Sequence, residues 1–377
     1  MKKLVLITGT GRSGTSTMSG TLHHLGLYVP GPYLGANKSN PKGFFESTWA
    51  IAFHRRITKA ARIDFFDGRP TALQRAREAV TPELRAELVD FLREQSAEHD
   101  QVVVKDPRTV WAHEVWFEAA AEAGLEICYI SMLRHPAEVV GSRRTYYARS
   151  EDPAGIRRYE NINVARWVNN SLISEHETRG RTRAFVRYVD LLADWRPVAE
   201  RLAEDLGLRY DTEVGAGEPH PVDDFIDPDL RRHTVTWDDL EVPRDLQEVA
   251  EATWGDLGVL SDHHGADADA EGDLDRQSVR YDLIVAQAAA VSYDLIQEAR
   301  TDGKREGASN ARKKLAAKKA SAPAQKPAQK PAQKPAQKPA QKPRRPKTVD
   351  EMPVGEVGGR DLLKVVASRA RRKLGRG

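Results

Sequence analysis

The sequence predicts an α/β fold in which a parallel sheet is flanked by helices, with a helical insertion and a disordered, basic C-terminal tail. Two observations carry this prediction. Short, almost unbroken apolar runs alternate with segments whose apolar residues recur at helical spacing, which is typical of parallel sheets covered on both faces. The first apolar run, residues 3–8, is also followed by a glycine-rich turn, after which apolar residues recur at helical spacing over residues 17–25.

The same patterns give the remaining elements in order. Further buried strands are predicted at residues 101–104, 125–133 and 184–189. Helices are predicted at residues 49–62, 72–98, 137–147, 195–206 and 278–300. The second of these helices should break where Pro82 follows Thr81, because Thr is a good N-cap and Pro fits the first helical position. Ligands of such sheets lie beyond the carboxyl ends of the strands, so candidate site residues belong there.

The turn at residues 9–16 (Gly-Thr-Gly-Arg-Ser-Gly-Thr-Ser) is P-loop-like. It directs the unpaired N–H groups at the start of a helix toward an anion. A dinucleotide site would need an acidic residue about twenty positions further on, but residues 19–45 contain no Asp or Glu. A nucleotide P-loop would have lysine where Thr15 stands. Arg12 and the surrounding hydroxyls instead suit a terminal oxyanion that is bound without a metal ion.

This turn resembles the 5′-phosphosulfate loop of sulfotransferases that use 3′-phosphoadenylyl sulfate (PAPS). In that family a P-loop-like turn, with Arg or Lys before Ser-Gly-Thr, holds the activated sulfate. The resemblance implies PAPS as co-substrate, with no metal required. It assigns cofactor binding to Gly11, Arg12, Ser13, Gly14, Thr15 and Ser16. A glycine-rich strand-to-helix turn without a ligand is the alternative interpretation.

A second motif supports the resemblance. Arg134 ends the third predicted strand, and Ser142 follows eight residues later in the next helix, so a guanidinium and a hydroxyl can converge on one phosphate. This pair is similar to the 3′-phosphate site of sulfotransferases. Residues 187–194 and 222–232 resemble further segments of bacterial family members. The resemblance covers residues 1–262, for which it implies the P-loop-like sulfotransferase fold.

The resemblance also implies catalytic roles. Arg12 and the loop amides would stabilise the negative charge that develops on the bridging oxygen. Lys105, at the end of the second predicted strand, matches a lysine near the sulfate of cytosolic sulfotransferases. In those enzymes a histidine follows the lysine by two positions, but Pro107 stands there in this sequence.

The base is therefore assigned differently. Other family members, including tyrosylprotein and some bacterial sulfotransferases, use a glutamate from the segment after the first helix, and Glu46 is the best match. Glu46 as a cap of the helix that starts near Ser47 is one alternative, and Asp106 as the base is another. Histidines are weaker candidates, more typical of surface or helix-packing positions: His23, His24 and His54.

The predicted function is transfer of the sulfuryl group of PAPS to a hydroxyl of a carbohydrate, glycolipid or small metabolite. Residues 49–100 and the helix around residues 166–170 would shape the pocket of this acceptor. One alternative is a nucleotide-dependent, kinase-like phosphotransferase, which should need Mg²⁺ and the missing P-loop lysine. The other is a non-catalytic nucleotide-binding scaffold that is anchored by the basic tail.

The C-terminal part of the chain has a different composition from the rest. Between residues 302 and 347, fifteen Lys or Arg stand against two acids, and five Pro-Ala-Gln-Lys units repeat from Pro323, which predicts an extended, disordered spacer. A basic amphipathic helix is expected within 348–377. It suggests an anionic membrane surface or an acidic partner. Nucleic acid is not an expected partner, because no aromatic residues interleave with the charges. Between the 1–262 domain and this tail we expect an acidic linker at 263–277 and a helix at 278–301.

Three further features concern location. The 377-residue chain has a formal net charge of +3, and no run approaches the ~20 apolar residues that span a bilayer. The apolar run near the N-terminus is too short for a signal peptide. The single cysteine, Cys128, lies in an apolar stretch and is expected to be a buried thiol. We expect a cytoplasmic protein, with attachment of the tail to the inner face of the membrane as a further option.

Overall fold

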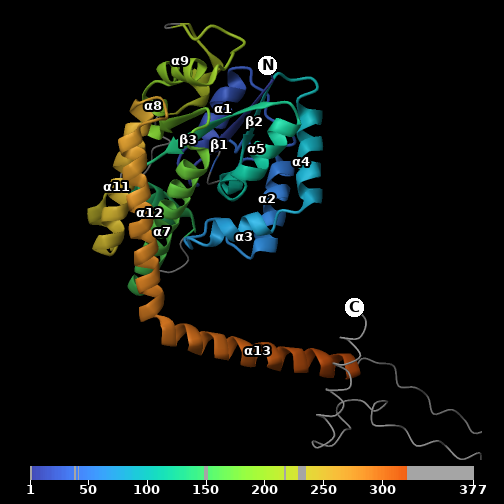
Figure 1. Ribbon diagram of the computed structural model, residues 1–377, viewed down its shortest axis with the longest axis vertical. Helices are drawn as coiled ribbons and strands as arrows, with labels where there is room; N and C mark the ends of the chain where they lie inside the picture. Colours follow the sequence, from blue (N-terminus) through green and yellow to red (C-terminus); the bar gives the residue numbers. More distant parts are fainter. Residues whose placement is uncertain are drawn as a thin grey trace, which may run out of the picture. The chain divides into compact units, whose positions relative to one another are not determined.

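The structure, a computed structural model, describes residues 2–37, 40, 42–147, 152–215, 218–227 and 235–320. The chain divides into two units between residues 302 and 303, and the first unit contains the sheet. Four parallel strands form this sheet in the order β2-β1-β3-β4 (Figure 1). The strands are β1 (Lys3–Thr8), β2 (Gln101–Lys105), β3 (Glu126–Leu133) and β4 (Arg183–Arg187). The predicted parallel α/β sheet is thus confirmed.

The central strand β1 is buried on both faces. Leu4 and Leu6 point to one face and Val5 and Ile7 to the other, and all four side chains are fully inaccessible to solvent. This alternation follows from the two-residue period of a strand, and it explains why the strand is an unbroken apolar run in the sequence.

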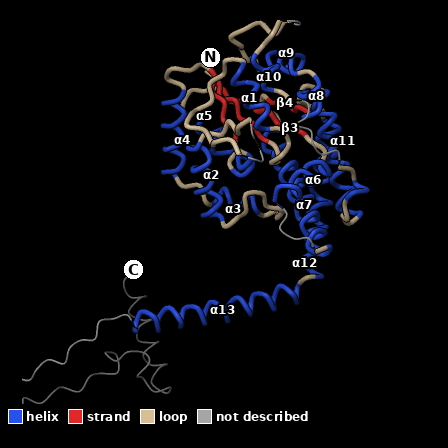
Figure 2. Tube along the Cα trace, turned by 180° about the vertical axis from the view of Figure 1, so that it is seen from behind, coloured by secondary structure: helices blue, strands red, loops and turns tan. Residues whose placement is uncertain are grey.

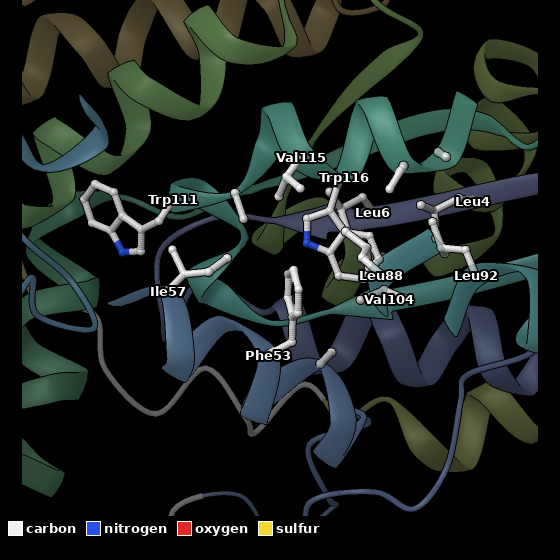
Figure 3. Close-up of a cluster of buried hydrophobic side chains, with 14 of the residues drawn as sticks. Leu4, Leu6, Phe53, Ile57, Leu88, Leu92, Val104, Trp111, Val115 and Trp116 are labelled. Carbon is white, nitrogen blue, oxygen red and sulfur yellow. The ribbon is translucent and has the colours of Figure 1, made fainter. Parts of the chain in front are cut away.

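Helices cover both faces of the sheet, as Figure 2 shows. The face with Leu4 and Leu6 packs against α2 (Thr48–Ala61), α4 (Pro82–Gln95) and α5 (His113–Glu122), where the side chains of Phe53, Leu88 and Trp116 interdigitate with it (Figure 3). The opposite face packs against α1 (Thr15–His24), α9 (Trp195–Leu206) and α10 (Pro221–Phe225).

The remaining helices extend the body beyond β3 and β4. A third apolar cluster joins α6 (Pro136–Tyr147), α7 (Pro153–Thr178), α11 (Arg244–Asp262) and α12 (Ala268–Val291). The short elements are α3 (Ala72–Glu78), α8 (Tyr188–Ala193), and the 3₁₀ helices η1 (Pro107–Trp111) and η3 (Trp237–Asp239). No helix in the described part of the chain is long and apolar enough to cross a membrane.

The expected helical insertion between β1 and β2 is present as α2, α3 and α4. Its predicted break is also confirmed, because α3 ends at Glu78 and α4 begins at Pro82. The hydroxyl of Thr81 accepts a hydrogen bond from the Leu84 N–H at 3.3 Å, which satisfies one of the unpaired amides at the helix start.

Two expectations about the C-terminal part were wrong. Most of the expected acidic linker at 263–277 is the first half of α12, where Leu274 is buried against the body and Asp267 caps the helix by accepting from the Ala270 N–H at 2.9 Å. Few apolar residues lie among the acids there, so the sequence pattern is faint. Residues 302–320, expected to be disordered, are the C-terminal part of α13 (Tyr293–Ala320), which is rich in the strong helix formers Ala, Lys and Arg.

Several expectations concern residues outside the described part of the chain. These are the Pro-Ala-Gln-Lys repeats, the amphipathic helix within 348–377 and part of the 222–232 segment. The attachment of the tail to a membrane surface or an acidic partner stays a prediction.

His113 at the start of α5 makes the stability depend on pH. Its side chain is fully buried, and neither ring nitrogen has a hydrogen-bond partner within the described residues. Burial, with the nearby charge of Arg181, lowers the pKa of His113 to about 3. The unfolded chain, with a histidine pKa of about 6.5, binds a proton below that pH that the folded chain excludes, so stability falls as the pH falls. Through His113, the native protein should lose about 2 kcal/mol of stability between about pH 7 and pH 5. We expect His113→Leu not to show this loss.

Urea unfolding at both pH values measures this difference. The exposed His176 provides the control, because His176→Leu should leave the pH dependence unchanged. The same pH dependence in the native protein and in His113→Leu contradicts the prediction.

Candidate active site

The turn between β1 and α1 has a backbone that only glycine tolerates at its last position. Gly14, the N-cap of α1, has φ +89°, and an added Cβ there would lie 2.1 Å from the ring of Tyr188. Arg12 also has a positive φ of 78°, which is costly for a residue with a side chain. The turn is therefore held in one conformation, with the N–H groups of Thr15, Ser16 and Thr17 at the positive end of the α1 dipole.

Arg12 meets both residues of the second motif. Its Nε donates to the Ser142 hydroxyl at 3.0 Å, and its carbonyl accepts from Arg134 Nη1 at 3.1 Å. Arg134 also pairs with Glu138, at 3.0 Å, and its guanidinium lies over the Tyr188 ring. Three predicted site residues from three separate elements thus lie together beyond the ends of β1 and β3.

Lys105 and Glu46 form a second group beyond the end of β2. The Lys105 ammonium donates to the Ser16 hydroxyl at 2.8 Å and is ion-paired with the Glu46 carboxylate. Both side chains are more than nine-tenths buried. Ser47, not Glu46, occupies the N-cap position of α2. The Glu46 carboxylate is instead directed to Lys105 beside the turn. Glu46 is therefore not the cap of α2.

Asp106, the alternative base, is enclosed on the far side of Lys105. It is fully buried, and its carboxylate accepts from His54 Nδ1 at 3.0 Å, from Arg108 Nη1 at 2.8 and 2.7 Å, and from the Arg108 N–H at 3.0 Å. The His54 Nε2 accepts from Trp116 Nε1 at 2.8 Å, so the ring proton is on Nδ1. Burial raises the pKa of Asp106. The hydrogen bond from His54 and the charge of Arg108 together lower it by more than burial raises it, so the net pKa lies below its ordinary value. Neither Asp106 nor His54 is placed to take a proton from a substrate.

The other two histidines also lie away from this chemistry. His23 and His24 are in the last turn of α1, where they contact the ring of Phe45. Burial lowers the pKa of His24, with the charges of His23 and His220 acting in the same direction.

Arg12 and Arg134 of the first group and Lys105 and Glu46 of the second line one pocket with a volume of about 450 Å³. Ser142 is buried beside Arg12 and is not among the lining residues. Of the described residues, five cations and one carboxylate, that of Glu46, line this pocket. The cations are Arg12, Lys105, Arg108, Arg134 and Arg143. Such an excess of positive charge in a concave site attracts ligands with several negative charges. Helix amides, hydroxyls and arginine forks are also the donors that phosphate and sulfate oxygens prefer, so the donor set fits PAPS.

Several lining residues were missed by the sequence analysis. Arg108 and Arg143 stack on the rings of Phe65 and Phe66, at 4.1 and 4.7 Å from the ring centroids. Tyr188 follows the end of β4, a position that strand-end reasoning could have marked. The two phenylalanines lie in the insertion and have no such signal. A second cavity, of about 590 Å³ between α3, α4 and α5, contains none of the predicted site residues.

Comparison with known proteins identifies the family. The model of the sulfotransferase family matches residues 5–212, more than half of the chain, and the chain belongs to this family. No curated protein matches it. Among solved structures, it is similar to the sulfotransferase domain from the Synechococcus PCC 7002 olefin synthase, with 18% identity and a TM-score of 0.38 over 68% of this chain and 96% of that domain. It is also similar to the sulfotransferase domain from the curacin biosynthetic pathway, with 16% identity and a TM-score of 0.37 over 68% of this chain and 98% of that domain.

Proposed function

We propose that this protein transfers the sulfuryl group of PAPS to a hydroxyl of an acceptor from the carbohydrate, glycolipid or small-metabolite classes. The observation that carries the proposal is the convergence of Arg12, Arg134 and Ser142 beside the N-terminus of α1. This convergence supports two adjacent anion sites, which would hold the 5′-phosphosulfate and the 3′-phosphate of PAPS. Membership of the sulfotransferase family supports the chemistry.

Each proposed binding residue has a physical role. The turn would hold the 5′ side through its amides and hydroxyls, and Arg134 with Ser142 would hold the 3′-phosphate. Bound PAPS supplies a sulfuryl group that is already activated by its bond to phosphate. Binding contacts to the 3′-phosphate lie away from the reacting centre, so they can position the co-substrate.

The transfer step needs a fixed cation and a base. The bond from sulfur to the phosphate oxygen breaks, a bond from sulfur to the acceptor oxygen forms, and the bisphosphate leaves with the electron pair. Arg12 and Lys105 would stabilise the charge on the bridging oxygen. Glu46 would take the proton of the acceptor hydroxyl. Because Lys105 contacts both Ser16 and Glu46, one ammonium joins the sulfate-binding turn to the proposed base.

Binding of adenosine 3′,5′-bisphosphate tests the proposal. At about a hundred times its dissociation constant, the bisphosphate should add about 2.7 kcal/mol of stability, which raises the Tm by about 4 °C. AMP lacks the 3′-phosphate and should give a much smaller shift. Thermal unfolding of the full chain with each nucleotide measures this difference.

Variants locate the binding. Arg134→Ala should lose the selective shift, and Arg134→Lys should keep part of it. Arg144, two residues after Ser142 in α6 and paired with Glu160 at 2.8 Å, does not line the pocket and provides a matched control. Stabilisation by ATP with Mg²⁺ alone would favour the kinase-like alternative instead. No shift with any nucleotide would mean that the turn binds none of them.

A further inference from the structure

The cation Arg108 has no role in the proposed binding of PAPS. It lies three residues after Lys105 in η1, lines the pocket and is 8% exposed. Its Nη1 donates to both oxygens of Asp106. Among the residues that the structure describes, its Nε and Nη2 have no hydrogen-bond partner. Because Arg108 lines the pocket, we take Nε and Nη2 as the donors that it can offer to a ligand there.

Arg108 is held rigidly. Its guanidinium carbon lies 4.1 Å from the centroid of the Phe65 ring, and its backbone N–H also donates to Asp106. Asp106 is fixed in turn by His54, and His54 by Trp116. A free arginine side chain loses about 2 kcal/mol of rotamer entropy when it is ordered. The buried network orders Arg108 when the protein folds, so this loss does not recur when a ligand binds. Donors that are fixed before binding are typical of recognition sites.

The strand order separates Arg108 from the 3′-phosphate pair. Arg134 and Ser142 follow β3, whereas Lys105 ends β2 and Arg108 follows it, and β1 lies between these two strands (Figure 1). Adjacent strands are about 4.8 Å apart, so the two strand ends are about 10 Å apart. Arg108 is three residues from Lys105, the ion-pair partner of the proposed base Glu46, and the acceptor hydroxyl must approach Glu46 if Glu46 is to take its proton.

The pocket wall around Arg108 is apolar. Phe65, 38% exposed, and Leu34, 40% exposed, are among the large apolar side chains that stay accessible. Other apolar lining residues are Phe44, Phe66 and Pro107. An acceptor in this pocket thus meets apolar surface and the fixed N–H donors of Arg108, near the charged pair of Lys105 and Glu46. A planar fork of two N–H groups matches a carboxylate in a bidentate arrangement.

We propose that the acceptor is a hydroxy acid with an apolar body, and that Arg108 binds its carboxylate through Nε and Nη2. This inference rests on the proposed function and narrows its acceptor class. Arg108 is the specificity-determining residue, and Asp106, His54 and Trp116 position it.

A matched pair of probes tests the inference. The full-length protein is titrated calorimetrically with 4-(hydroxymethyl)benzoate and with 4-methylbenzyl alcohol, which has the same ring and hydroxyl but an uncharged methyl group in place of the carboxylate. Both titrations are made with and without saturating adenosine 3′,5′-bisphosphate. The carboxylate probe should bind at least about tenfold more tightly, as for a hydrogen-bonded charge pair.

Variants assign this preference to Arg108. Arg108→Gln should reduce the preference to about twofold or less, and Arg108→Lys, which keeps a cation beside Asp106, should reduce it in part. Arg69 is the matched control, because it also bonds an aspartate two residues before it, at 2.6 Å, but lies outside the pocket. Arg69→Gln should keep the full preference.

Other outcomes overturn the inference. These are equal affinity for the two probes, binding of neither, or an unchanged preference in the Arg108 variants. If Arg108→Gln does not fold, Arg108→Lys and the native protein still decide. Failure of the proposed function is a separate result. In that case the native protein does not bind adenosine 3′,5′-bisphosphate, whatever its affinity for the two probes.

Discussion

Replacing Glu46 with glutamine should lower the rate of sulfuryl transfer by about 10²–10⁴-fold while the affinity for adenosine 3′,5′-bisphosphate changes little. Glutamine has the shape of glutamate and can still accept a hydrogen bond from Lys105, but it cannot take a proton from the acceptor. Glu46→Ala should also abolish turnover. Transfer of radiolabelled sulfate from PAPS to a hydroxyl acceptor measures the rate, and calorimetry measures the affinity.

Glu87→Gln serves as the control for this experiment. It removes an exposed carboxylate of the helical insertion, paired with Arg56 at 2.6 Å, and should leave both quantities unchanged. Normal turnover in Glu46→Gln would remove Glu46 from the role of base. Loss of bisphosphate binding together with turnover would show that Glu46 acts through Lys105 on the sulfate-binding turn.

The sheet was predictable because its strands are buried on both faces. A short, unbroken apolar run such as Leu4–Ile7 is typical of a parallel strand that helices cover on both sides, and β1 and β2 have nearly the predicted bounds. The fourth strand was predicted to reach Val189, but β4 ends at Arg187 because α8 begins at Tyr188. Helices that lack a single apolar stripe were harder to predict from the sequence. The helix α7 spans Pro153–Thr178, but it was predicted only around residues 166–170.

The site was predictable where strand geometry determines it. Carboxyl ends of neighbouring parallel strands lie at one edge of the sheet, so a turn after β1, a lysine at the end of β2 and an arginine after β3 had to lie near one another. The contacts of Arg108 with Phe65, and of Arg143 with Phe66, could not be predicted in this way. Each joins residues more than forty positions apart, and tertiary packing of the insertion decides which of them meet.

The buried network behind the pocket also follows from packing and gives the second large effect. Asp106→Ala should lower the free energy of unfolding by about 3–5 kcal/mol, because it leaves the Arg108 guanidinium without its carboxylate and the His54 N–H without its acceptor. Urea unfolding at neutral pH measures the change. Glu87→Ala, which breaks an exposed pair, should cost less than about 1 kcal/mol. A cost for Asp106→Ala as small as that of Glu87→Ala would contradict the role given to the network.

The pH dependence of the Asp106→Ala effect has a definite sign. The folded pKa of Asp106 is lowered, so its stabilising contribution is fully present above the unfolded aspartate value of about 3.9 and is lost as the pH falls through the lower folded value. The difference in stability between the native protein and Asp106→Ala should therefore be constant near neutral pH and shrink only below about pH 4. A difference that shrinks already between about pH 7 and pH 5 would contradict the assignment of this pH dependence to Asp106.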